Sequence, residues 1–481
     1  MDTPGSQDDL KALEIAHRNA TDYLAGLPHR PPRPRASYAD QCEAFDEDLP
    51  KSPSPISDVI AELANKAGPG LMGMASPTFF RWVIGGSHPA GVAAEWLTSA
   101  WGQNTGNPDA TPSAAAAETV VSRWLLEILD LPRESSVGFV TGATMANFVC
   151  LAAARYQVLS EAGWDVETKG LVGSPRIEII VGEEAHASIQ SALRYLGLGN
   201  RTATIIPSDD QGSMDTEGLK RALKESPSGP KIVITQAGQI NTGAFDPFSE
   251  IATLRREHEF WWHVDGAFGL WARANPESKS LAEGIELADS WATDGHKWMQ
   301  TPYDCGYAIV KHEAAHRRSM SIEASYLPEA EAGIRDPAQY VPELSRRARG
   351  FASWAIIKSL GREGISEIVG RHCRLAKRFA DMIGQEDGIS VLNTVVINQV
   401  IVRFGLAEHD VDTKDSLTQE TIKAIQDHDV CYLGGSVWKG RWVMRISIVS
   451  WRTQEADVDR SAASIIDSWR KVRSVGELEK Q

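Results

Sequence analysis

Cysteine is scarce in this chain, and no long uninterrupted apolar run occurs in it. The five cysteines are scattered, form no C-x-x-C pair and are odd in number, which argues against a disulfide framework and favours a reducing, cytoplasmic setting. No apolar stretch approaches the roughly 20 residues that span a bilayer. Residues 1–9 contain no basic stretch leading into an apolar one, so we expect neither a membrane segment nor a secretory signal.

Positive charge is also in short supply. The chain has 49 Lys and Arg residues against 64 Asp and Glu residues, a formal net charge of −15. This balance argues against nucleic acid or an anionic membrane surface as the main partner. The histidines show no paired ligand spacing, so the sequence predicts no metal site. With 42% apolar and 23% charged residues over 481 positions, the chain fits a globular protein with a large and a smaller domain.

The first 88 residues differ in character from the rest. Residues 1–60 are polar and include a proline cluster at 27–35, and such a segment buries little surface by itself. We interpret residues 1–88 as an extended N-terminal arm, a dimerisation segment that packs on a second subunit. A disordered tail is the alternative.

The middle of the chain alternates between helical and strand patterns. In residues 114–131 apolar side chains recur on one helical face, and short apolar strands then alternate with helices. Strands this short, separated by helices, indicate a mostly parallel sheet with helices on both faces. A large α/β domain is therefore predicted over residues 89–350, with strands expected at 137–141, 177–181, 202–206, 231–236 and 260–265.

After residue 348 this alternation ends. A long helix is predicted over 351–384, and a closing helix over 455–472. Between them the apolar runs are separated rather than evenly spaced, which is typical of an α+β unit. Residues 351–481 are therefore predicted to form a small C-terminal α+β domain, with strands near 389–393, 398–404 and 441–449.

Two charged residues follow expected strands in suggestive settings. Lys297, between a histidine and a tryptophan, is poised to enter a pocket, where burial favours the neutral amine that forms an imine with an aldehyde. Asp265 ends an apolar strand, where a carboxylate can hold a pyridine nitrogen protonated. Taken singly, Lys297 is better interpreted as a solvated surface charge, and Asp265 equally well as a helix N-cap.

Two further motifs also follow strands. Residues 141–147 (Thr-Gly-Ala-Thr-Met-Ala-Asn) connect a strand to a helix, where the Thr144 hydroxyl and the first helical N–H groups can hold a phosphate. His186, in Gly182-Glu-Glu-Ala-His186, is placed to stack on a flat ring, although a structural histidine is the commoner case. Because all four motifs come just after strands, they are predicted to converge on one crevice.

In this order the motifs resemble those of the group II pyridoxal-phosphate-dependent amino-acid decarboxylases, the family of aromatic-amino-acid and glutamate decarboxylases. The resemblance covers about residues 76–450. It is most specific in Ala292-Thr-Asp-Gly-His-Lys-Trp-Met-Gln-Thr-Pro-Tyr-Asp-Cys-Gly306 and in His263-Val-Asp-Gly-Ala-Phe-Gly-Leu-Trp271. It implies the α/β architecture of PLP-dependent transferase fold type I, with a mostly parallel seven-stranded sheet, and a homodimer with shared active sites.

The resemblance implies pyridoxal 5'-phosphate as the cofactor, held by Lys297 as a Schiff base. It makes Asp265 the partner of the pyridine nitrogen and His186 a residue stacked on the ring, with Ala267 against the opposite ring face. Lys297, Asp265 and His186 are therefore also candidate catalytic residues. Further cofactor contacts are implied for Ala143, Thr144, Asp294 and His296.

The resemblance implies an amino acid as the substrate. Arg346 matches an arginine that such enzymes place near the substrate carboxylate. Tyr326 matches the tyrosine of a mobile catalytic loop, which protonates Cα after carbon dioxide leaves and reaches the neighbouring subunit's site. The segment 76–86 is rich in apolar side chains, so we expect an aromatic or other hydrophobic substrate that contacts Phe79, Trp82 and Val83.

The predicted reaction is decarboxylation of an L-amino acid to an amine and carbon dioxide, by way of an external aldimine and a quinonoid. Which Cα bond stands perpendicular to the cofactor ring decides the reaction. An aminotransferase is the main rival, because Arg445 matches a carboxylate-binding arginine of that fold type; a structural salt bridge is the alternative reading of Arg445. Aldehyde formation and retro-aldol cleavage also stay open, although a tyrosine at position 326 favours the amine.

Overall fold

The computed structural model describes residues 7–199, 201–321 and 334–478, and its central feature is a seven-stranded sheet. The strand order is β1-β7-β6-β5-β4-β2-β3, and β7 runs antiparallel to both of its neighbours while the other pairs are parallel. This confirms the predicted α/β class and the mostly parallel sheet. The strands are β1 (Ser136–Val140), β2 (Glu178–Gly182), β3 (Thr204–Ile206), β4 (Lys231–Gln236), β5 (Trp261–Asp265), β6 (Ser290–Asp294) and β7 (Gly306–Val310).

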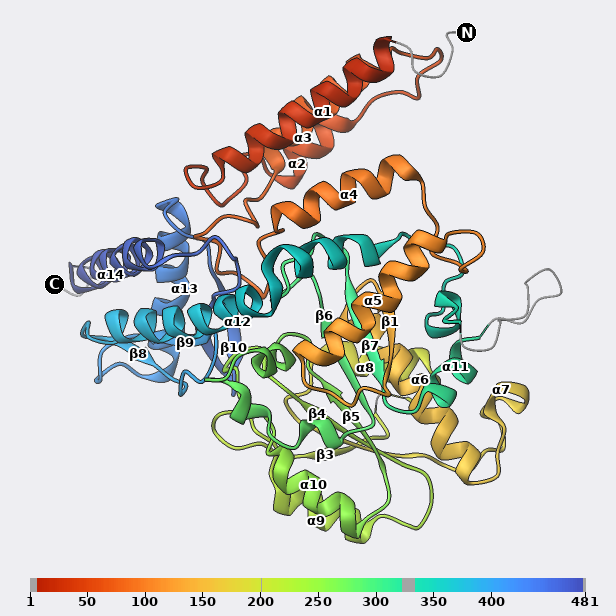
Figure 1. The fold of residues 1–481 in the computed structure, drawn as a ribbon. Coiled ribbons are helices and arrows are strands. Elements are labelled where there is room, and N and C mark those ends of the chain that lie inside the picture. The colour runs from red at the N-terminus through yellow and green to blue at the C-terminus, as the bar shows by residue number, and fades with distance from the viewer. Residues whose placement is uncertain (1–6, 200, 322–333, 479–481) are drawn as a thin grey trace.

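Helices cover both faces of this sheet (Figure 1). On β5, Trp262 and Val264 belong to one apolar core and Trp261 belongs to the other, as expected of a strand buried on both faces. The helix α6 lies across β5, β6 and β7. The helices of this part are α4 (Pro89–Trp101), α5 (Pro112–Ile128), α6 (Ala143–Glu161), α7 (Val166–Lys169), α8 (Ala187–Tyr195), α9 (Thr216–Glu225), α10 (Phe248–Glu257) and α11 (Glu313–Met320).

A second, antiparallel sheet lies in the C-terminal part of the chain, with the strand order β10-β11-β9-β8. One face of it packs on helices: Val402, Met444 and Ile446 share an apolar core with residues of α12, α13 and α14. This confirms the expected small α+β unit, although β10 and α13 were not predicted. The elements are α12 (Arg349–Ile383), β8 (Ile389–Val391), β9 (Gln399–Phe404), α13 (Val411–Asp427), β10 (Gly434–Trp438), β11 (Arg441–Ser447) and α14 (Glu455–Leu478).

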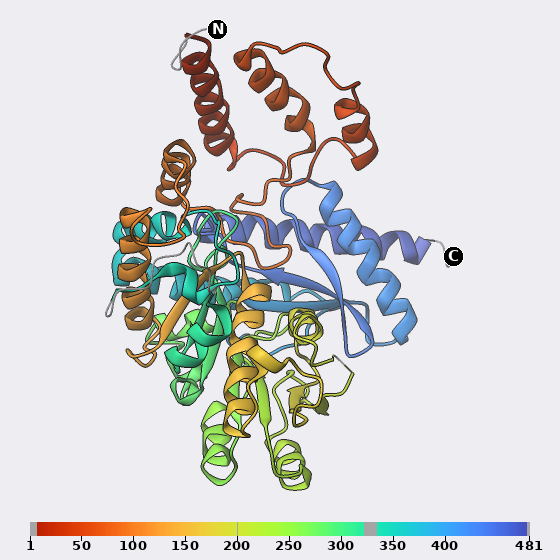
Figure 2. The same ribbon diagram turned by 90° about the vertical axis from the view of Figure 1, so that its right-hand side faces the viewer.

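The N-terminal segment is helical, which the sequence did not predict, and its role as an arm that packs on a second subunit stays a prediction. It forms α1 (Gln7–Gly26), α2 (Tyr38–Phe45) and α3 (Ile56–Ala67). The helices α1 and α3 pack side by side, and the Asp8 carboxylate accepts a hydrogen bond from the first N–H of α3 at 2.7 Å. The two helices stabilise each other through this pairing, which polar composition alone did not reveal. They project from the rest of the molecule (Figures 1 and 2), with large apolar side chains exposed at Leu10, Leu13, Val59 and Leu63.

A connecting segment, residues 79–85, links the two sheets near the carboxyl ends of the strands of the large sheet. Phe79 forms a bridge with Tyr432, next to the small sheet, and five residues after Phe80 the chain reaches Gly85. The N–H of Gly85 donates to the carbonyl of His296 at 3.0 Å. The segment therefore runs from the small sheet to the residues that follow β6. None of the helices in the described ranges is both long and apolar enough to cross a membrane.

Candidate active site

The turn between β1 and α6 is held against the end of β6. The backbone N–H of Ala143 donates to Asp294 Oδ1 at 2.6 Å, and Ala143 and Thr144 begin α6. A Cβ placed on Gly306 would lie only 2.5 Å from the Cα of Gly142, so the glycine of β7 is what permits this close approach. The positive end of the α6 dipole consequently faces Asp294.

Asp294 also holds the two residues predicted beside it. The Lys297 ammonium lies 2.9 Å from Asp294 Oδ2, and His296 Nε2 lies 3.4 Å from Asp294 Oδ1. His296 Nδ1 accepts a hydrogen bond from the N–H of Cys305 at 3.3 Å, so the ring proton of its neutral form is on Nε2. Burial lowers the pKa of His296 against the opposing charge of Asp294, which favours that neutral form.

Asp265 lies at the end of β5 and is buried. Its Oδ1 accepts from the N–H of Ala267 at 3.2 Å, and its Oδ2 accepts from Asn147 Nδ2 at 3.2 Å and from the Ser188 hydroxyl at 3.5 Å. Burial raises the pKa of Asp265, although the charges of His186 and Lys297 act against that rise. All three hydrogen-bond donors are neutral, so the carboxylate is poised to receive a cationic group.

His186 is tied to Asp265 through one serine. It is the N-cap residue of α8: its Nδ1 accepts from the N–H of Ser188 at 3.2 Å and lies 2.9 Å from the Ser188 hydroxyl. That hydroxyl is the one that reaches Asp265. The structure thus brings together all eight residues for which a cofactor contact was predicted, in two linked groups around Asp294 and Asp265.

The sequence reasoning missed residues that support Asp265 from behind. Asn147, one turn into α6, donates to Asp265 and lies 2.9 Å from His263 Nε2. Burial lowers the pKa of His263 to about 3, so this histidine is neutral. Asn147 stands in the glycine-turn motif and Ser188 stands two residues after His186, which are the only sequence signals for them. Tyr303 was also missed; its ring stacks on His296 with centroids 4.3 Å apart.

The three residues expected to contact the substrate lie in different environments. Phe79 is 3% exposed and stacks on Tyr432, and Val83 is 4% exposed within the core of the large domain. Trp82 is 40% exposed and has a φ of 58°, a left-handed backbone conformation that is unusual for a tryptophan. Among the three, Trp82 is the one that presents a large apolar surface outward.

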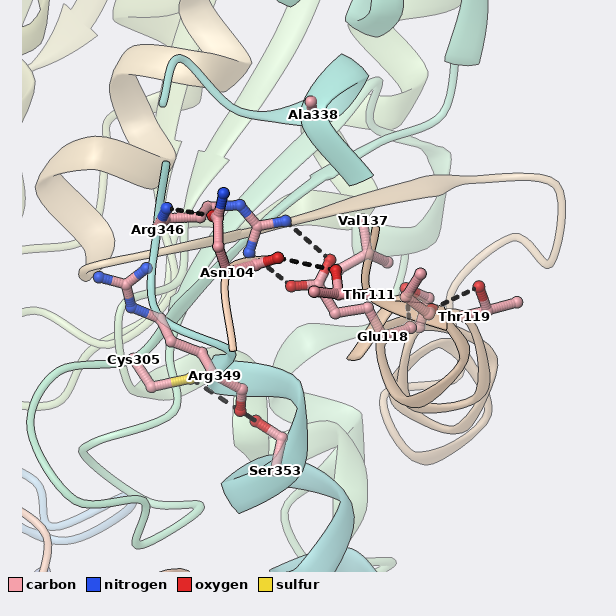
Figure 3. A network of polar contacts seen from close by, with 12 residues as sticks. Asn104, Thr111, Glu118, Thr119, Val137, Cys305, Ala338, Arg346, Arg349 and Ser353 are labelled. Carbon is pink, nitrogen blue, oxygen red and sulfur yellow. Dashed lines mark hydrogen bonds and ion pairs between the residues drawn. The ribbon is translucent and has the colours of Figure 1, made fainter. Parts of the chain in front are cut away.

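The structure does not bring Arg346 into contact with the groups around Asp265 and Asp294. Its guanidinium forms a bidentate pair with the fully buried Glu118 of α5, with Nη2 2.9 Å from Oε2, and its backbone N–H donates to Asn104 (Figure 3). Arg335 approaches the same carboxylate at 3.8 Å. Both charges of the close pair are therefore already satisfied beside β1. Tyr326, the predicted proton donor, lies outside the described residues.

This donor set fits pyridoxal phosphate. Lys297 supplies an amine for its aldehyde. Asp265 supplies a buried acid for its pyridine nitrogen, and among the described residues only neutral groups donate hydrogen bonds to this acid. The N-terminus of α6, with Thr144 and His296 beside it, offers donors for a phosphate. The glycine pair at 142 and 306 leaves room there that a methyl group would fill.

Comparison with known proteins gives the same family along most of the chain. The model of the pyridoxal-dependent decarboxylase conserved domain matches residues 39–405. A tyrosine decarboxylase from Narcissus pseudonarcissus is 24% identical over 94% of this chain and 93% of its own length. An acidic amino acid decarboxylase from Xenopus tropicalis is 29% identical over 66% of this chain and 62% of its own length.

A solved structure agrees at the level of the fold. The crystal structure of Oryza sativa TDC with PLP and tryptamine superposes with a TM-score of 0.90 over 98% of this chain and 99% of that one, at 23% identity. At this identity the likeness concerns the fold alone. Because the family model matches well over half of the sequence, the chain belongs to the pyridoxal-dependent decarboxylases, enzymes that use pyridoxal phosphate.

Proposed function

We propose that this enzyme converts an L-amino acid into the corresponding amine and carbon dioxide, with pyridoxal phosphate bound to Lys297. The observation that carries the proposal is the pair of carboxylates at neighbouring strand ends. Asp294, at the end of β6, contacts the Lys297 ammonium and accepts a hydrogen bond from the N–H of Ala143 at the start of α6. Asp265, at the end of the neighbouring strand β5, accepts hydrogen bonds from neutral donors. This arrangement supports the proposal, because it offers an amine for the aldehyde of a substituted pyridine and an acid for its ring nitrogen.

The bound cofactor would supply a ring that takes up the electrons of a breaking Cα bond. Asp265 would hold a proton on the ring nitrogen, with Asn147 and Ser188 fixing the direction of its carboxylate. His186 and Ala267 would confine the ring from its two faces. Lys297 would exchange places with the substrate amine, and Asp294 would keep that lysine near the α6 turn.

Tyr326 is proposed as the group that delivers a proton to Cα once carbon dioxide has left. Replacing Tyr326 by phenylalanine removes only the phenolic hydroxyl. We expect the Tyr326→Phe variant to form less amine and more aldehyde, measured together with ammonia and carbon dioxide by chromatography. An unchanged yield of amine would assign the proton transfer to another group.

The proposed function is tested first on Lys297. A panel of L-amino acids is offered to the purified enzyme, and carbon dioxide, amine, ammonia and aldehyde are all measured. Borohydride should fix the cofactor covalently to wild-type enzyme, and Lys297→Ala should lose both this labelling and the activity. Covalent labelling that persists in the variant would assign cofactor attachment to another residue, and keto-acid-dependent amine transfer would indicate an aminotransferase.

We further propose that the enzyme works as a homodimer. The helices α1 and α3 project from the body and expose apolar side chains, as expected of surfaces that another subunit covers. A molecular mass in solution close to twice 52.5 kDa would support this state, and a mass of one chain would contradict it. Removal of residues 1–67 should then convert the dimer to monomer.

A further inference from the structure

Gln300 is a fully buried amide, three residues after Lys297, that joins separate parts of the chain. Its side-chain oxygen accepts a hydrogen bond from the N–H of Gly86 at 2.7 Å and another from the N–H of Trp451 at 3.1 Å. Its Nε2 donates to the carbonyl of Val449 at 2.8 Å. Gly86 follows the connecting segment, and the other two partners follow β11 of the small sheet. One side chain therefore joins the segment that carries the lysine to both.

The same amide contacts the turn that begins at the lysine. Its Nε2 lies 3.0 Å from the carbonyl oxygen of Trp298 and 3.2 Å from that of Lys297, and the backbone N–H of Gln300 donates to the Lys297 carbonyl at 3.1 Å. An amide has two N–H donors and two acceptor positions on its oxygen, so these contacts use all of them. The Lys297 carbonyl is therefore held by both the side chain and the backbone of Gln300.

The backbone of Gln300 adopts a conformation that glycine takes most easily. Its φ is 64°, in the left-handed region, and its carbonyl accepts a hydrogen bond from the N–H of His88 at 2.8 Å. This conformation is strained for a residue with a side chain. Glycine would relieve the strain but would supply no amide. The hydrogen bonds of the Gln300 side chain therefore offset the strain of the turn.

A second connection runs from the lysine turn to the small domain through Trp298. Its Nε1 donates to Nδ1 of His372 in α12 at 2.8 Å, and His372 Nε2 lies 3.0 Å from the carbonyl oxygen of Ser450. Burial lowers the pKa of His372 to about 3, so the ring is neutral and its one proton, on Nε2, is donated to that carbonyl. Ser450 lies between the two partners of Gln300 that follow β11, so both connections end at the same place.

Close packing leaves the lysine turn little room to move. A Cβ on Gly85 would overlap the carbonyl oxygen of Lys297, and a Cβ on Gly86 would overlap the hydroxyl of Ser450. From this fixed backbone the Lys297 ammonium reaches Asp294 Oδ2 at 2.9 Å. The lysine therefore stands where the large domain, the connecting segment and the small domain meet.

We propose that Gln300 is a positioning residue for Lys297, because its amide fixes the lysine turn against the small domain and the connecting segment. This inference rests on the proposed attachment of the cofactor to Lys297. In that attachment the lysine amine condenses with the cofactor aldehyde, and water is released. The Gln300 side chain bonds only backbone groups, so it acts through the lysine. Its loss should affect the bond that the lysine forms and leave non-covalent binding of the cofactor intact.

The experiment compares two forms of the cofactor on the cofactor-free chain. Pyridoxal phosphate carries the aldehyde that Lys297 can bond, whereas pyridoxamine phosphate carries an amine there and binds without that bond. Because a displacement of about 1 Å can cost about 100-fold, we expect Gln300→Met to bind pyridoxal phosphate about 10-fold to 100-fold more weakly and pyridoxamine phosphate within about 2-fold of wild type. Fluorescence titration measures both affinities. In the holoenzyme, kcat should fall by a similar factor with a smaller change in KM.

Gln399→Met is the matched control, because Gln399 of β9 is an equally buried amide that accepts a hydrogen bond from the Ser447 hydroxyl at 2.6 Å. It should lower the free energy of unfolding and leave both affinities unchanged. An equal loss of both affinities in Gln300→Met, or a loss of neither, would overturn the positioning role.

Gln300→Gly is the second variant, and it decides the matter if Gln300→Met does not fold. It relieves the backbone strain and also lacks the amide, so it should show the same selective loss of pyridoxal phosphate affinity. Wild-type affinity for pyridoxal phosphate in Gln300→Gly would overturn the proposal, since the amide would then be dispensable. Failure of the proposed function would appear separately, as absence of carbon dioxide release from every L-amino acid by the wild-type enzyme, and the two affinities would still test Gln300.

Discussion

At the scale of single residues, Asn147 orients the buried carboxylate of Asp265. Its Nδ2 donates to Asp265, so its Oδ1 faces His263 Nε2 at 2.9 Å and must accept the proton there. His263 Nδ1 then accepts from the hydroxyl of Ser290, 2.9 Å away. Because the low pKa keeps His263 neutral, this set of protons is the only one that satisfies every partner. Through the Asn147 amide, the buried His263 therefore helps to hold the buried Asp265 carboxylate in place.

Replacing Asn147 by alanine should weaken cofactor binding. The change leaves Asp265 one donor short and His263 without an acceptor, and such losses cost about 1–3 kcal/mol in a buried site. We expect pyridoxal phosphate to bind the Asn147→Ala variant about 10-fold to 100-fold more weakly, measured by titrating cofactor-free protein. Asn398, a buried amide that donates to Ile448 at 2.9 Å in the small domain, is the control. Equal cofactor affinity in Asn147→Ala and Asn398→Ala would contradict the assigned role.

At the scale of elements, β7 shapes the turn before α6, the proposed phosphate end of the site, without contributing a charged side chain. It inserts antiparallel between β1 and β6 and brings Gly306 against the turn at Gly142. Three backbone atoms of Gly142 would lie within 3.0 Å of a Cβ at position 306. Backbone atoms cannot move aside as a flexible side chain can. The start of α6 is therefore placed by the fit of one glycine against another.

A single methyl group at position 306 should separate these elements. We expect Gly306→Ala to lower the free energy of unfolding by about 1–3 kcal/mol, as overpacking does, and to weaken cofactor binding because the Ala143 N–H moves away from Asp294. Urea unfolding and cofactor titration measure the two effects. Gly26→Ala is the control, since no atom lies within 4 Å of its added Cβ. Wild-type behaviour of Gly306→Ala in both measurements would show that the contact is not limiting.

Short apolar strands in the middle of the chain could be predicted from sequence, and all five that were expected lie within two residues of the observed bounds. The residues after them could be placed together because parallel strands end at one edge. β7 was missed because its sequence continues directly from the lysine motif, and only its antiparallel partners make it a strand. The α1–α3 pair was missed because each helix buries little surface alone and the two stabilise each other.

The enclosure of single side chains was harder to predict than the ends of strands. Phe79 stacks on Tyr432, which lies far away in the sequence, and Arg346 pairs with Glu118. Arg81 and Arg445 likewise come together only through the contact between the connecting segment and the small sheet. Such partners depend on tertiary packing, and no local spacing encodes them. Contacts of this kind are therefore the part of the structure that the sequence left most open.

At the scale of the whole molecule, three buried histidines link stability to pH. Burial lowers the pKa values of His263, His316 and His372 to about 3 in each case. An unfolded chain takes up protons at these positions below about pH 6.5, whereas the folded chain does not until about pH 3. Each histidine thus stabilises the fold fully above pH 6.5, and this stability is lost as the pH falls. Asp246 acts in the opposite direction, because burial raises its pKa to about 6.

The contribution of one histidine can be isolated at His316, which lies in α11 away from the cofactor residues. Its Nε2 donates to the carbonyl of Tyr340 at 2.9 Å, and its Nδ1 lies 2.8 Å from the Ser136 hydroxyl. Between pH 6 and 4.5 the wild-type protein should lose about 1.4 kcal/mol more per pH unit than the His316→Gln variant, which has no group to protonate there. Urea unfolding at several pH values measures both slopes, and the exposed His29, replaced by glutamine, serves as the control. If His316→Gln and His29→Gln change the slope equally, burial of His316 does not account for the pH dependence.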